Sequence, residues 1–122
     1  MGRRIAVFLG FILASILAGA VADAGRVQYS PIQYLKNFAL SVCLADGYRS
    51  AEAVKDSLAA AGGYSELGSL PFEAYEEAES LAKQFLAKKY ESVSGQKLIL
   101  MKCVDLLNSQ ELDQLAAKYS RK

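Results

Sequence analysis

Apolar residues recur at intervals of three and four along nearly all of residues 25–122, and this spacing constrains the fold more than any other feature. These intervals place side chains on one face of an α-helix, whereas a half-buried strand requires strict alternation. The pattern therefore predicts an all-α fold, and a segment of this length is expected to form a single helical domain.

Polar caps and glycines divide this range into about five expected helices. Ser30 and Pro31 open the first helix, because serine is a good N-cap and proline suits the first helical position. Gly47 is expected to end this helix in a left-handed conformation. The inward face of the helix is expected to contain Leu35, Phe38, Ala39, Val42 and Cys43.

Two further helices are expected on either side of a glycine-rich segment. Ser50 caps the second helix, and the glycines at 62–63 are expected to stop it. Residues 62–71 hold three Gly, two Ser and one Pro without a helical period, which predicts an exposed loop. Ser69 and Pro71 then start a long third helix. Its inward face is expected to contain Phe72, Tyr75, Ala78, Ala82, Phe85 and Leu86.

The last two expected helices follow a break at residues 92–95. Residues 98–107 are apolar on nearly all sides, so this fourth helix is expected to be the central apolar helix of the bundle. Asn108 with Glu111 resembles a capping box that starts the fifth helix.

Residues 1–24 have the pattern of a signal peptide. The basic pair Arg3-Arg4 precedes an apolar stretch, and small residues then recur at alternate positions, as signal peptidase requires. Cleavage is expected after Ala24, with Ala22 as the next choice. A permanent membrane anchor is the alternative, because the apolar stretch is near the lower length limit for spanning a bilayer. Removal of the segment predicts a periplasmic protein with no membrane attachment.

Cys43 and Cys103 are the only cysteines, and both lie in the part that would be exported. In an oxidising compartment an even pair predicts one disulfide, whereas in the cytosol the same residues would be buried thiols. A catalytic thiol is the sharper alternative. The chain has no histidine to activate such a nucleophile, which argues against it.

Composition excludes several classes of function. Residues 25–122 carry 12 Lys and Arg and 12 Asp and Glu, so they lack the basic surplus that nucleic-acid binding needs. Without histidine, the commonest general base and zinc ligand are missing, and no metal site or cofactor is expected. No phosphate-binding loop or nucleophile elbow is present. The chain is therefore not expected to be an enzyme.

One surface combines features of a protein-binding site. Tyr64 lies in the glycine-rich segment and either projects outward as an interface anchor or packs on its own domain. The acidic start of the third helix continues this surface. Its carboxylates could alternatively be the paired catalytic groups of a glycoside hydrolase, but a run of acidic residues on one helix face is usually exposed to solvent. The expected partner-binding residues are Gly63, Tyr64, Ser65, Glu66, Leu67, Gly68, Glu73, Glu76 and Glu77.

Three stretches resemble a known family. YLKNFALSVCLADGY at 34–48, GGYSELGSLPFEAYE at 62–76 and LILMKCVDLLNSQELDQLAAKY at 98–119 are similar to the periplasmic amidase immunity proteins of type VI secretion systems. The nearest group is the one that neutralises the fourth amidase effector class. The likeness covers nearly all of residues 25–122 in order, with both cysteines placed as expected.

The resemblance implies a helical homodimer that inhibits a secreted peptidoglycan amidase, a Cys-His hydrolase, and so protects the producing cell and its kin. In the family a protruding loop between helices reaches the toxin's active-site cleft. By position this loop is matched to residues 63–68, and the loop at 46–49 is the competing match. The alternative is a non-enzymatic periplasmic adaptor or structural protein that dimerises through a helix face.

Overall fold

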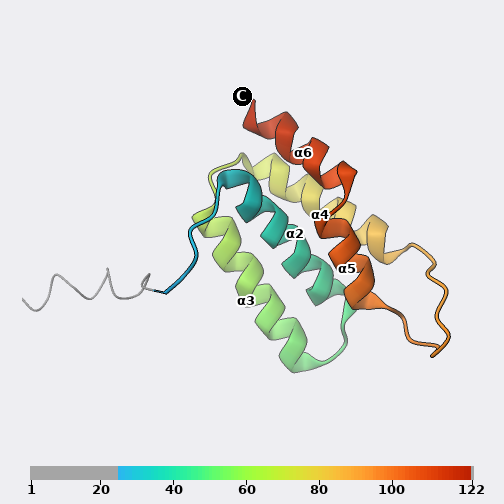
Figure 1. The fold of residues 1–122 in the computed structure, drawn as a ribbon. Helices are drawn as coiled ribbons and strands as arrows, with labels where there is room; N and C mark the ends of the chain where they lie inside the picture. The colour runs from blue at the N-terminus through green and yellow to red at the C-terminus, as the bar shows by residue number, and fades with distance from the viewer. Residues whose placement is uncertain (1–24, 122) are drawn as a thin grey trace, which may run out of the picture.

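A computed structural model describes residues 25–121 of the chain, and in this range it contains five helices and no strand (Figure 1). The all-α prediction is confirmed. The expected signal peptide at residues 1–24 lies outside the described residues, among which no helix is both long and apolar enough to cross a bilayer. The helices are α2 (Pro31–Gly47), α3 (Ala51–Leu67), α4 (Phe72–Leu86), α5 (Ile99–Leu107) and α6 (Gln110–Ser120).

Serine caps determine where three of these helices begin. The hydroxyl oxygens of Ser30 and Ser50 accept hydrogen bonds from backbone N–H groups three residues later, at 3.1 and 3.5 Å. The last helix is capped by Ser109, whose Oγ accepts from the N–H of Leu112 at 3.1 Å. The expected cap at Asn108 was wrong by one residue, because the backbone N–H of Asn108 still donates to Val104 and belongs to the end of α5.

The central helix of the bundle is α2. It contacts each of the other four helices, and its side chains at Leu35, Ala39 and Cys43 are fully buried. Figure 1 shows α2 between α3 on one side and α4 and α5 on the other. Burial of this apolar stripe against four neighbours supplies the main driving force for folding.

The prediction that residues 98–107 form the central helix was wrong. In α5, Cys103 and Leu106 are fully buried, but Leu100, Met101 and Val104 are 55, 54 and 41 % exposed. A helix of nine residues packs along one stripe only, and within residues 25–121 of a single copy no element covers the opposite face.

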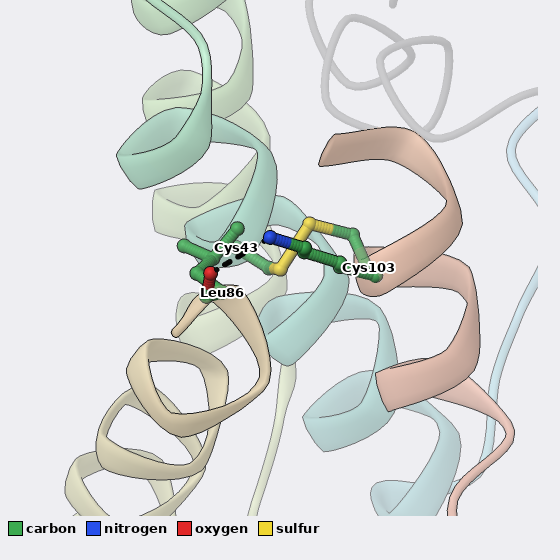
Figure 2. The surroundings of a disulfide bond; sticks show 4 residues. Cys43, Leu86 and Cys103 are labelled. Atoms are coloured by element: carbon green, nitrogen blue, oxygen red, sulfur yellow. Dashed lines mark hydrogen bonds between the residues drawn. A yellow bond between two sulfur atoms is a disulfide. The ribbon is translucent and has the colours of Figure 1, made fainter. Parts of the chain in front are cut away.

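The predicted disulfide is confirmed. Cys43 in α2 and Cys103 in α5 are bonded, with their Cα atoms 5.6 Å apart, and both are fully buried (Figure 2). The bond joins the short helix α5 directly to the centre of the bundle.

Gly47 ends α2 as expected, but not in a left-handed conformation. The chain leaves the helix through Tyr48, whose backbone is extended at φ −82° and ψ 153°. Glycine is required here by a close approach, because a Cβ atom at this position would lie 2.3 Å from Cγ2 of Ile99 at the start of α5.

The predicted stop of the second helix at residues 62–63 was also wrong, since α3 continues to Leu67. Glycine weakens a helix interior by about 1 kcal/mol relative to alanine. Here the extra turns bring the ring of Tyr64 to 6.4 Å from those of Tyr29 and Tyr34, and aromatic contacts of this kind contribute about 0.5–1.5 kcal/mol each. Tertiary packing therefore offsets the weak local propensity.

Candidate partner-binding site

Residues 87–98 form the longest connection between helices in the described part of the chain. The connections at 48–50, 68–71 and 108–109 are short, whereas this one leaves the end of α4, extends away from the bundle and returns to α5 (Figure 1). We call residues 87–98 the protruding loop.

The tip of the protruding loop presents one apolar side chain to solvent. Val93 is fully exposed, and the hydroxyls of Ser92 and Ser94 on either side of it lie 3.1 Å apart. A turn closes beneath the tip, where the N–H of Gly95 donates to the carbonyl oxygen of Ser92 at 3.3 Å. Gly95 has φ +77°, a conformation that glycine adopts without strain. The turn therefore holds Val93 outward.

A buried lysine joins the two helices that flank the protruding loop. Nζ of Lys102 in α5 donates to the carbonyl oxygen of Leu86, the last residue of α4, at 3.1 Å. Lys102 is buried, and its ammonium group also lies 5.7 Å from the centre of the Tyr90 ring. A cation at a helix C-terminus interacts favourably with the unpaired carbonyls. Figure 2 shows that Leu86 lies beside the disulfide between Cys43 and Cys103.

Tyr90 makes the second tie between the loop and α5. Its hydroxyl donates to Oδ2 of Asp105 at 2.5 Å. This hydrogen bond to Asp105 raises the pKa of the Tyr90 phenol, and desolvation and the nearby carboxylate charge act in the same direction. The bond favours the protonated phenol and holds the first arm of the loop against α5.

The residues matched from sequence to the partner-binding loop lie in a helix instead. Residues 63–67 form the last turns of α3, and Gly68 is its C-cap. Tyr64 is half-buried against Tyr29 and Tyr34, so it packs on its own domain, whereas Ser65, Glu66 and Leu67 are exposed. The assignment of 63–68 as a protruding loop was therefore wrong in its local structure.

The three acidic residues at the start of α4 do not share one role. Glu73 and Glu76 are exposed, as expected. Glu77 is half-buried and accepts hydrogen bonds from Lys118 at 3.0 Å and from the Tyr119 hydroxyl at 2.6 Å, which join α4 to α6. Glu77 therefore has a structural role in this chain.

The structure does bring part of the predicted surface together. Ser65 and Glu76 both line a hollow of about 490 Å³ between the end of α3 and the start of α4, beside Phe72. Phe72 was expected to point inward but is 72 % exposed. This hollow lies at the opposite end of α4 from the protruding loop.

Sequence reasoning missed the protruding loop, although a signal was present. The sequence Ser-Val-Ser-Gly at 92–95 interrupts the helical period, which indicates a loop. Residues 62–71 contain more glycine, so the partner-binding loop was assigned to them instead. Within residues 25–121, no group of three His, Cys, Asp or Glu side chains is placed to hold a metal ion.

Comparisons with known proteins identify one family that this chain matches. A family model described as type VI secretion system amidase immunity protein, Tai4, matches residues 33–116. None of the curated proteins matches the chain. A solved structure of the effector–immunity system Tae4/Tai4 from Salmonella typhimurium contains a chain with 37 % identity and a TM-score of 0.70, over 74 % of this chain and 89 % of that one.

Two further solved structures show the same fold at lower identity. One is the Tae4–Tai4 complex from Enterobacter cloacae, at 23 % identity and TM-score 0.67, covering 74 % of this chain and 92 % of the other. The second is Tae4 from Salmonella typhimurium in complex with Tai4 from Enterobacter cloacae, at 24 % identity and TM-score 0.65, covering 72 % and 91 %.

Proposed function

The chain belongs to the Tai4 family of type VI secretion system amidase immunity proteins, and from this premise we propose that it binds a Tae4-type peptidoglycan amidase and blocks its active-site cleft with the protruding loop. As a member of this family it is an inhibitor rather than an enzyme. Its action protects the producing cell and its kin from the toxin.

The observation that carries the proposal is the outward position of Val93 at the tip of residues 87–98. A cleft that binds an extended peptide has the shape to accept a narrow loop. Because a turn, the Tyr90–Asp105 hydrogen bond and the Lys102–Leu86 hydrogen bond already order this loop, it loses little conformational entropy on binding.

The exposed residues predicted from sequence remain a second candidate contact. These exposed residues lie near the end of α3 and the start of α4, and two of them, Ser65 and Glu76, line one hollow together with Phe72. The full set is Ser65, Glu66, Leu67, Glu73 and Glu76. Such a surface suits a basic patch on the same amidase, where opposite charge would mainly accelerate association. Glu66→Arg should then lower the association rate without changing the melting temperature.

Location in the periplasm and assembly as a homodimer complete the proposal. The signal-peptide pattern at residues 1–24 and the disulfide both suit export to an oxidising compartment. Mass spectrometry of the protein from a periplasmic extract should give a chain that starts after Ala24 or Ala22, and light scattering should give twice the chain mass.

The test is inhibition of peptidoglycan cleavage by the cognate amidase. Val93→Asp should raise the inhibitory concentration at least about 100-fold, because it places a charge in the centre of a desolvated contact. Val27→Asp, at another exposed valine outside the loop, is the matched control. Full inhibition by Val93→Asp would exclude the loop as the blocking element. Failure to bind any amidase would favour a structural adaptor.

A further inference from the structure

A hollow of about 650 Å³ lies at the base of the protruding loop. Two segments far apart in the sequence form it: residues 47–49, at the turn between α2 and α3, and residues 95–101, which include the returning arm of the loop and the first turn of α5. We call it the base hollow. It is continuous with the loop, because residues 95–98 belong to both.

The base hollow combines an apolar wall with positive charge. Leu100 and Met101, two of the exposed apolar residues of α5, line it. Arg49 and Lys97 also line it, both are exposed, and neither makes an ion pair within residues 25–121. No carboxylate is among its lining residues.

The backbone at the start of α5 adds donors to the same place. Leu98, the N-cap residue, has φ 55° and ψ 40°, a left-handed conformation that costs a residue with a Cβ about 1–2 kcal/mol. Its side chain cannot accept a hydrogen bond, so the first N–H groups of α5 have no side-chain cap. Strain of this kind persists only where the surrounding structure fixes the conformation, and it occurs most often at functional sites.

We propose that the base hollow receives an acidic side chain of the amidase, flanked by an apolar one, when the protruding loop enters the cleft. This inference rests on the proposed function and assigns the chemistry of a second contact. The carboxylate would pair with Arg49 and Lys97, and the apolar neighbour would cover Leu100 and Met101. Charge pairing across an interface is expected to fix register and select partners.

The experiment measures the affinity of residues 25–122 for a catalytically inactive amidase by biolayer interferometry, at low and high salt. The double variant Arg49→Glu, Lys97→Glu should bind at least about 100-fold more weakly than the wild type, with the difference shrinking in high salt. The matched control, Lys55→Glu with Lys83→Glu, makes the same change in net charge away from the hollow and should stay within about threefold.

Three outcomes separate this inference from the proposed function. If Val93→Asp abolishes binding but the Arg49, Lys97 double variant binds like the wild type, the base hollow is not a contact and the inference is overturned. If neither change weakens binding, the loop proposal fails as well. If the double variant alters only the solution mass in light scattering, the base hollow lies between copies of the chain, and the inference is again overturned.

Discussion

Removing the disulfide should lower the stability of this bundle by a large fraction of its total. The cysteines are 60 residues apart in the sequence, so the bond closes a long loop in the unfolded chain. The chain-entropy relation gives about 14 cal/mol/K for such a loop, or about 4 kcal/mol at 25 °C. Domains of this size are typically stable by about 5–15 kcal/mol, so the loss should be readily measured.

The effect should be greatest at α5. Only Lys102, Cys103 and Leu106 are buried in this helix, and its other face is exposed. The disulfide, the Lys102–Leu86 hydrogen bond and the packing of Leu106 and Ile99 on the core therefore attach it to the bundle. Breaking the bond should let α5 and the protruding loop exchange their amide protons faster than α2 does.

Urea denaturation followed by circular dichroism measures the loss. The oxidised wild type is compared with the reduced wild type and with the variant Cys43→Ala, Cys103→Ala, which should be insensitive to reductant. Reduction leaves both sulfur atoms in place, so it isolates the cross-link from the packing of the side chains. A difference of less than about 1 kcal/mol between the oxidised and reduced proteins would refute the loop-closure reasoning.

Two further predictions concern single residues. Gly68→Ala should destabilise the protein by about 1–3 kcal/mol in thermal denaturation, because the new Cβ would lie 1.7 Å from the Tyr75 hydroxyl. Gly62→Ala in α3 should instead stabilise it by up to about 1 kcal/mol, because a Cβ at that position would have no other atom within 4 Å. The Tyr90 pKa is raised by its hydrogen bond to Asp105, so its contribution to stability is fully present below the unfolded pKa of about 10 and is lost as the pH rises through the folded pKa. Alkaline titration at the tyrosinate absorbance band should therefore lose one component that ionises above the ordinary tyrosine range in Tyr90→Phe, and an unchanged curve would contradict the assigned bond.

Features that depend on a few neighbouring residues could be predicted from the sequence. The caps at Ser30 and Ser50 follow from side-chain chemistry within one turn, and the inward stripe of α2 follows from spacing alone. The pairing of Cys43 with Cys103 followed from a compartment argument and a count of two, without any knowledge of the fold.

The features that were predicted wrongly depend on tertiary packing. Two glycines were expected to stop α3, but the helix continues for more than a further turn. Its extension is stabilised by contacts of Tyr64 with Tyr29 and Tyr34, which lie outside α3 and far away in the sequence. The apolar residues all round α5 predicted a central position, yet such a pattern also arises where one face is left for a partner. Composition cannot distinguish these two cases.

The order of the protruding loop and the attachment of α5 are consequences of the same contacts. Lys102, Cys103 and Asp105 all lie in α5, and they hold the end of α4, the centre of α2 and the first arm of the loop, respectively. Any change that detaches α5 therefore frees the loop at the same time, and a freed loop must be ordered again on binding. Because one of the three contacts is a disulfide, the loop is held fully in place only in the oxidised protein. Inhibition of the amidase should thus weaken on reduction even in the absence of urea, where α2, α3 and α4 remain folded.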